Sequence, residues 1–264
     1  MEKQFESEII HQSRHQFLYG RNTPEREKML KKMIESNPIK MNDDYPMALY
    51  LEDYSLYSDT KNEAVEQILL TRMNQEYFNF SLAVQLLEKT LDGNNLSLYP
   101  EAVEKFLRSV NRLFINSDAK DIGSLQELLN ILKLGCDFYK IHYQATLNAG
   151  CFTGFIGDIP ISFLDLPAFI RNFKKMLNNN SYVAAVIDVK NPITKIATQT
   201  INDYLARRCN GDLSIKVVTE PAGWVSYYDT VGRAVEYIHD YGIVELDDSF
   251  KIHIEEVKKR SKRI

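Results

Sequence analysis

The stretch FLYGRNTPEREKML, residues 17–30, joins an apolar run to a helix-forming run, and phosphate-binding loops sit at junctions of this kind. A helix N-terminus carries partial positive charge and unpaired N–H groups, which together attract anions. Gly20 ends the apolar run, and Arg21 and Arg26 could hold an anion beside it. Two glutamates in the same stretch oppose a polyanion, although they also complement a helix dipole. The junction therefore predicts either a phosphate site or an ordinary strand-to-helix turn.

Polar residues also follow two later apolar runs. SYVAAVID (181–188) ends in Asp188, and DLSIKVV (212–218) is followed by Thr219 and Glu220. Ligands of parallel sheets bind at the carboxyl ends of the strands, so these side chains are candidates for a site. Glu220 could act there as a general base. In the alternative interpretation, all three residues simply belong to the turns that follow their strands.

The elements that would position these residues alternate between strands and helices. Residues 15–20 and 46–53 are expected strands, and the helix between them has its apolar residues on one face. The later expected elements are strands at 159–163, 181–188, 212–218 and 241–246, a helix capped by Asp165, and a helix with Asn191 as N-cap, Pro192 at its first position and Gly211 after its last turn. Such alternation predicts an α/β fold, with a mainly parallel sheet flanked by helices.

The middle of the chain has helical periodicity and no clear strand. One helix is expected over residues 62–91 with Gly93 as its C-terminal cap, and another begins near Pro100. A third begins at Ser124, whose spacing to Glu127 is that of a capping box. These helices predict an all-helical insertion. The domains that follow are an α/β core of residues 1–60 and 151–264 and an inserted helical subdomain of residues 61–150.

This order of elements resembles the core of the AAA+ and STAND branch of P-loop NTPases, over roughly residues 15–55 and 180–248. The resemblance implies ATP and Mg²⁺ as cofactors. The roles that it implies are phosphate contacts from Gly20, Arg26 and Thr219, beside which Arg21 could hold an anion, Mg²⁺ binding by Asp188, and, in an active protein, catalysis by Asp188 and Glu220.

The sequence departs from the family pattern GxxxxGK[ST], although the spacing is kept. Arg26 stands at the lysine, and its planar fork is wider than a compact ammonium. Glu27 stands at the hydroxyl residue that helps to hold Mg²⁺, and Glu25 stands at the second glycine. Val189 stands where many relatives have a glutamate that activates water. These losses together predict that rapid ATP turnover is absent.

We therefore expect a degenerate NTPase-like subunit that acts as a scaffold or regulator in a protein complex, for which a nucleic-acid-processing complex is one candidate. One alternative is an active ATP- or GTP-binding NTPase, in which Arg26 replaces the lysine, Asp188 holds Mg²⁺ and Glu220 activates water. A further alternative is a nucleic-acid-associated regulator that binds no nucleotide and uses the basic tail VKKRSKRI (257–264). Under the first reading, the protein is not an enzyme.

Two further groups of side chains have competing interpretations. Trp224, Tyr227 and Tyr228 lie close together in sequence, and they could stack on a base or anchor a partner, or else pack onto the core. Arg207 and Arg208 lie near the end of an expected helix, where cations suit the dipole. The resemblance also allows either arginine to reach a neighbouring subunit of an oligomer.

The composition limits the partners and the compartment. A net charge of −4 argues against extensive wrapping of nucleic acid. The 3 cysteines are odd in number and widely spaced, which favours reduced cytosolic thiols, and the histidines have no metal-ligand spacing. The N-terminus lacks the apolar core of a signal peptide, and no apolar stretch approaches the roughly 20 residues that span a bilayer. We expect a cytoplasmic protein with a protein partner or a homo-oligomeric state and no membrane contact.

Overall fold

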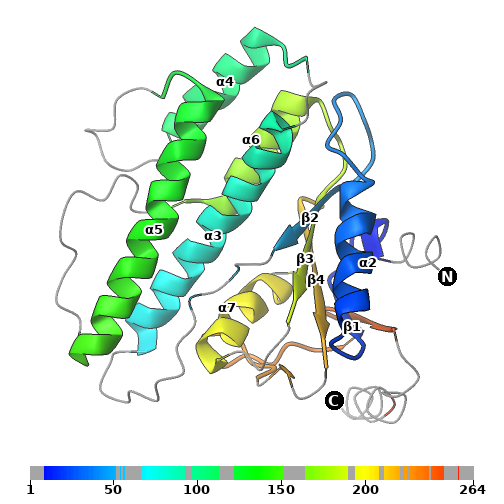
Figure 1. Ribbon diagram of the computed structural model, residues 1–264, viewed down its shortest axis with the longest axis vertical. Helices are drawn as coiled ribbons and strands as arrows, with labels where there is room; N and C mark the ends of the chain where they lie inside the picture. The colour runs from blue at the N-terminus through cyan, green and yellow to red at the C-terminus, as the bar shows by residue number, and fades with distance from the viewer. Residues whose placement is uncertain are drawn as a thin grey trace. The chain divides into compact units, whose positions relative to one another are not determined.

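The computed structural model describes residues 9–51, 54, 56, 67–92, 97–112, 122–151, 164–189, 194–207, 211–220, 223–224, 226–237, 239–246 and 255 (Figure 1). The chain forms two compact units. Unit 1 comprises residues 1–38, 46–52 and 182–264, and unit 2 comprises residues 39–45 and 53–181. Unit 2 therefore takes in the helix that follows Asp165, which the sequence-based division places in the α/β core.

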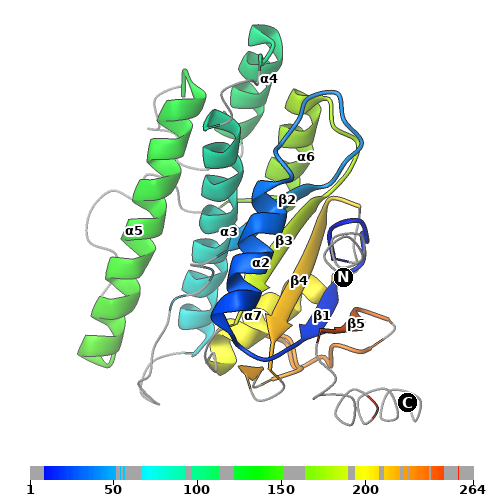
Figure 2. The same ribbon diagram turned by 45° about the vertical axis from the view of Figure 1, so that its right-hand side comes forward.

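A parallel sheet of five strands forms the centre of unit 1 (Figure 2). The strands are β1 (Gln16–Tyr19), β2 (Met47–Leu51), β3 (Val183–Asp188), β4 (Leu213–Thr219) and β5 (Gly242–Glu245). Their order is β2-β3-β4-β1-β5, and every neighbouring pair is parallel. The predicted α/β class and these strands are confirmed, whereas the strand expected at 159–163 lies outside the described residues.

Helices cover both faces of this sheet, which explains why the residues of β2 and β3 are all buried. Helix α2 (Pro24–Glu35) begins after Thr23, whose hydroxyl accepts from the backbone N–H of Arg26 at 3.2 Å. It packs onto one face through a cluster of apolar side chains: Leu18, Leu30, Met33, Ile34, Ala48, Val186 and Val218. Helix α7 (Lys195–Leu205) lies on the opposite face (Figures 1 and 2).

The predicted start of α7 is wrong. The helix begins at Lys195 with Thr194 as its N-cap, whereas Asn191 and Pro192 lie outside the described residues. The Thr194 hydroxyl accepts a backbone N–H of the first turn at 3.2 Å, which is the role that the sequence gives to Asn191. Gly211 has a φ of 73° but lies several residues beyond the end of the helix at Leu205.

A buried polar cluster fixes the register of β1 against β4. The Lys216 ammonium donates to the backbone oxygens of Gln12 and Arg14, each at 2.6 Å. It also donates to Gln16 Oε1 at 2.7 Å. Burial, together with the charge of Lys216, lowers the pKa of His15 to about 3, so its ring is neutral and accepts a backbone N–H of β4 at 2.9 Å. A shift of one residue in the pairing of β1 with β4 would separate all of these hydrogen-bond partners.

The elements that the structure describes in unit 2 are all helices: α3 (Gln67–Leu91), α4 (Pro100–Asn111), α5 (Leu125–Ala149) and α6 (Leu166–Leu177). Helix α3 packs against α5, and α4 packs against α6. The predicted start at Pro100 and the N-caps Ser124 and Asp165 are confirmed, since both side chains accept a first-turn N–H. Gly93 lies outside the described residues.

Glu76 is a buried carboxyl on α3 that holds the chain just before α6. Its Oε2 accepts from the backbone N–H of Leu164 at 3.2 Å, and Asn79 Nδ2 donates to the Leu164 oxygen at 3.0 Å. Burial raises the pKa of Glu76 from 4.5 to about 7, although the Leu164 hydrogen bond and the charge of Arg72 act in the opposite direction. The folded protein therefore favours the neutral acid.

Glu76→Gln should stabilise the protein above about pH 7. Because the folded-state pKa is raised, the contribution of the carboxyl to stability is fully present below pH 4.5 and is lost as the pH rises through 7. We expect the free energy of unfolding of the variant to exceed that of wild type by roughly 1–3 kcal/mol at about pH 8. At about pH 4.5 we expect no measurable difference between the two. Urea denaturation across this range measures the difference, and a difference independent of pH would contradict the prediction.

Candidate functional site

The carboxyl edge of three adjacent strands brings the predicted site residues together. Gly20 follows β1, Thr219 ends β4 and Asp188 ends β3. In the sheet, Tyr19 is the register partner of Thr219, and β4 also pairs with β3. The Gly20 N–H donates to the Thr219 oxygen at 3.2 Å. Residues that are far apart in the chain thus share one edge of unit 1, as the parallel topology requires.

Arg26 and Asp188 form a buried ion pair at this edge. Arg26 Nη2 lies 2.5 Å from Asp188 Oδ1, and the two side chains are 6% and 1% exposed. The Tyr50 hydroxyl donates to the other carboxylate oxygen, Oδ2, at 3.0 Å. Both oxygens of Asp188 are therefore engaged by groups of the protein itself. In such a dry environment the two charges stabilise one another, and either charge alone would be costly.

The guanidinium of Arg26 also holds the loop that follows β1. Its Nη1 donates to the Gly20 oxygen at 2.7 Å, and its Nη2 donates to Asn22 Oδ1 at 3.3 Å. Its Nε is buried without a hydrogen-bond partner. The side chain thus extends beneath the loop toward the sheet, whereas a phosphate-binding cation would present its charge to a ligand above the loop.

Two backbone N–H groups of the loop have acceptors on side chains of the protein. The Asn22 N–H donates to Glu220 Oε1 at 2.7 Å, and the Arg26 N–H donates to Thr23 Oγ1. Pro24 has no N–H to offer. In phosphate-binding loops, successive N–H groups of this kind face the anion. The loop therefore has the shape of a strand-to-helix turn, in which the N–H groups of Asn22 and Arg26 already have acceptors.

Packing accounts for several residues that the family pattern draws attention to. A Cβ at Gly20 would lie 2.9 Å from the Cβ of Leu246, so the glycine is required by close packing. Glu27 forms an ion pair with Lys31 at 2.9 Å, and Glu25 is exposed in the first turn of α2. Both glutamates complement the helix dipole. These features favour the interpretation as an ordinary turn.

The two strand-end positions beside Asp188 are also enclosed. Val189, at the position where the resemblance expects a water-activating glutamate, is 2% exposed. Thr219 is fully buried, and its hydroxyl donates to the backbone oxygen of Glu220 at 2.8 Å. Because side chains alternate along a strand, Thr219 faces away from Val218, which packs beneath α2. These side chains do not fit a nucleotide with Mg²⁺, because those of Asp188 and Thr219 are already hydrogen-bonded to groups of the protein.

The aromatic residues after β4 divide between the core and the surface. The ring of Trp224 is 3% exposed and meets Phe17 edge-on, with 5.1 Å between the ring centres. Tyr227 also contacts Phe17, and its hydroxyl is hydrogen-bonded to that of Tyr19 at 2.8 Å. Tyr228 is 56% exposed. Packing onto the core is thus correct for Trp224 and Tyr227, while Tyr228 remains at the surface.

Of the remaining predicted cations, the structure describes two. Arg207 follows the end of α7, and its guanidinium lies 5.2 Å from the ring centre of Tyr204. Arg21 is exposed on the loop after β1. Arg208 and the basic tail at 257–264 lie outside the described residues.

Sequence reasoning missed Tyr50 and Asn22. Tyr50 belongs to an apolar strand in which a tyrosine is an ordinary core residue, so only its contact with Asp188 reveals a role. Asn22 is a usual loop residue, and its interaction with Glu220 spans 198 positions of the chain. Neither contact leaves a local signal in the sequence.

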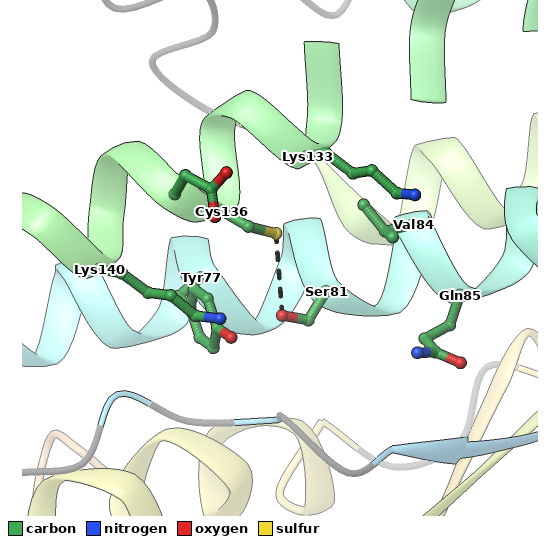
Figure 3. Close-up of a pocket in the computed structure, with 8 residues that line it drawn as sticks. Tyr77, Ser81, Val84, Gln85, Lys133, Cys136 and Lys140 are labelled. Atoms are coloured by element: carbon green, nitrogen blue, oxygen red, sulfur yellow. Dashed lines mark hydrogen bonds between the residues drawn. The ribbon is translucent and has the colours of Figure 1, made fainter. Parts of the chain in front are cut away.

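Unit 2 has a shallow cavity of about 240 Å³ between α3 and α5 (Figure 3). Its lining residues are Tyr77, Ser81, Val84 and Gln85 on α3 and Lys133, Cys136, Asp137 and Lys140 on α5. Figure 3 shows Cys136 and Ser81 facing one another, with 3.9 Å between Sγ and Oγ. Lys133 forms an ion pair with Glu88 at 2.7 Å, and the Lys140 ammonium lies over the ring of Tyr77. Both lysines thus interact with residues of α3.

Within the described part of the chain, no cluster of three or more histidine, cysteine or acidic side chains is arranged to hold a metal ion. The same residues include no helix with the length and apolar character needed to cross a membrane. Comparisons of the chain with protein-family models, with curated proteins and with solved structures found no match.

Proposed function

We propose that this chain is an NTPase-like subunit that has lost nucleotide hydrolysis and acts as a scaffold or regulator in a protein complex. The buried pair of Arg26 and Asp188 carries the proposal. Arg26 stands at the position of the phosphate-binding lysine, and Asp188 stands at the position of the aspartate that serves Mg²⁺. Because each charge neutralises the other inside the protein, neither is available to a nucleotide.

The strand order supports the family resemblance on which this proposal rests. In the order β2-β3-β4-β1-β5, strand β4 lies between the strand that leads into the loop and the strand that ends in Asp188. The cores of AAA+ and STAND proteins share this arrangement. It differs from the doubly wound orders of dinucleotide-binding and flavodoxin-like folds.

Exposed apolar side chains support a protein partner. Leu134 and Ile141 are seven positions apart on α5, so they share one helix face, and both are more than half exposed. In unit 1, Tyr228 and Val231 are exposed in the segment after β4. Large apolar side chains that gather on one face mark contact surfaces more often than single ones do. The acidic net charge makes a protein a better partner than nucleic acid.

A phosphate-release assay with MgATP and MgGTP tests the loss of hydrolysis. We expect no release above the blank from the wild-type chain, and the same result from Asp188→Asn. Turnover by wild type that disappears in Asp188→Asn would favour the active-NTPase alternative. For the scaffold role, we expect the chain purified from its own cells to have a mass above the 30.6 kDa of one copy, whereas a monomer without a partner would contradict it.

A further inference from the structure

Helix α5 carries a regular strip of side chains that is apolar except at its last position. Leu134 and Ile141 are 59% and 66% exposed, and they belong to a series whose members are separated by three and four residues in turn. This series, which we name the α5 strip, comprises Ile131, Leu134, Phe138, Ile141, Ala145 and Asn148. The alternation of three and four is the spacing of a coiled-coil seam, so the α5 strip suits contact with another helix.

A different face of α5 is fixed against α3, which lies along one side of α5 in both views (Figures 1 and 2). The rings of Phe80 and Tyr139 stack with 5.7 Å between their centres, and Lys133 forms an ion pair with Glu88 at 2.7 Å. A Cβ at Gly135 would lie 3.3 Å from the Phe80 ring, so the two helices approach closely. Because these contacts already order α5, a second helix could bind the α5 strip without the cost of ordering it.

The charge of the α5 strip favours an uncharged partner surface. Among the strip and its flanking positions 130, 135, 137, 142, 144 and 149, Asp137 is the only acidic residue, and there is no lysine or arginine. A strongly charged partner, including nucleic acid, would form few ion pairs there. It would also lose the hydration of its own charges. A second copy of the α5 strip offers a surface of the same neutral character.

The side chains of the α5 strip also match in size when two copies run antiparallel. Phe138 then faces Ile141 of the second copy, and Leu134 faces Ala145, whose methyl group leaves room for the larger side chain. Two-fold symmetry makes each contact twice, so Phe138 and Ile141 of both copies form a large apolar centre. The polar Asn148 lies at the end of the contact, where water can reach it.

We propose that the α5 strip is a self-association surface, on which α5 of a second copy lies antiparallel. At 1.5 Å per residue, the strip is about 26 Å long and holds fewer than three heptads. Longer seams are usual in permanent coiled coils, so the dimer is reversible, with a Kd on the order of micromolar. This inference rests on the proposed function and deepens it, because it names a second copy as the protein partner.

Sedimentation velocity of the full chain over roughly 1–200 µM tests the proposal. We expect the wild-type mass to rise from the 30.6 kDa of one copy toward twice that value. Leu134→Glu introduces a charge on each side of the dimer, so we expect association to weaken at least about tenfold. Val231→Glu is the matched control, because it places the same charge at an aliphatic residue that is 86% exposed and lies outside α5. We expect that variant to associate as wild type does.

The double variant Leu134→Glu, Ala145→Lys tests the antiparallel arrangement. In that arrangement each new glutamate faces the new lysine of the other copy, so we expect the double variant to associate at least about tenfold more tightly than Leu134→Glu. In a parallel arrangement, like charges would meet and no recovery would follow. Far-UV circular dichroism of each variant verifies that the helices remain folded.

The outcomes separate this inference from the proposed function. A wild-type chain that stays monomeric at the highest concentration overturns the inference alone, because a scaffold can still bind a different protein. A dimer that Leu134→Glu leaves unchanged, or a double variant without recovery, also overturns it. Release of phosphate from MgATP by a dimeric wild-type chain overturns the proposed function instead, and the self-association surface stands.

Discussion

Arg26→Met should destabilise unit 1 by about 3–5 kcal/mol. The substitution leaves the carboxylate of Asp188, 1% exposed, without its cation, while the Tyr50 hydroxyl still donates to it. It also removes the guanidinium that holds the oxygen of Gly20. Urea denaturation followed by tryptophan fluorescence measures the effect in this unit, because the single tryptophan, Trp224, is buried there.

The double variant Arg26→Met, Asp188→Val is the control for that prediction. It removes both charges together, and valine suits the end of a strand. Replacing a buried ion pair by apolar residues is often neutral or stabilising, so we expect the double variant to regain most of the stability lost in Arg26→Met. One contradicting result is that the stability losses of the single variants Arg26→Met and Asp188→Val simply add in the double variant. Another is that Arg26→Met costs less than about 1 kcal/mol. Either result would mean that the pair is not buried in solution.

Trp224→Ala should cost a similar amount, about 3–5 kcal/mol, for a different reason. The indole ring is 3% exposed and packs edge-on against Phe17, so truncation leaves a large cavity beside the sheet. Trp224→Phe should cost less than about 1.5 kcal/mol, because it keeps a ring and the indole Nε1 has no hydrogen-bond partner to lose. Far-UV circular dichroism during urea denaturation measures both variants.

Tyr228→Ala provides the comparison within the same segment. Since Tyr228 is 56% exposed, the substitution should change stability by less than about 0.5 kcal/mol. The opposite pattern, with Trp224→Ala stable and Tyr228→Ala destabilised, would contradict the assignment of Trp224 to the core.

The edge of the sheet could be predicted because parallel topology determines which residues meet. Apolar runs ending at Tyr19, Asp188 and Thr219 are strands, and alternating helices require that these strand ends share one edge. The start of α7 could not be predicted, since Asn191–Pro192 and Thr194 both carry N-cap signals. A local pattern cannot rank two such caps, because tertiary packing decides between them.

The internal contacts that occupy the site residues could not be predicted from the sequence. Arg26 and Asp188 are 162 positions apart, and whether the arginine points toward the sheet or toward a ligand depends on the tertiary structure. The contact of Glu220 with Asn22 likewise joins two distant turns. The sequence predicts which chemical groups are missing from a phosphate loop, whereas the structure supplies the internal partners of the groups that remain.

Calorimetric titration of MgATP into the wild-type chain tests most directly whether this edge of the sheet is closed by its own residues. We predict no saturable heat up to millimolar nucleotide, because Asp188, Arg26 and the Asn22 N–H already have internal partners. Saturable binding with a micromolar Kd that is lost in Asp188→Asn would contradict this prediction.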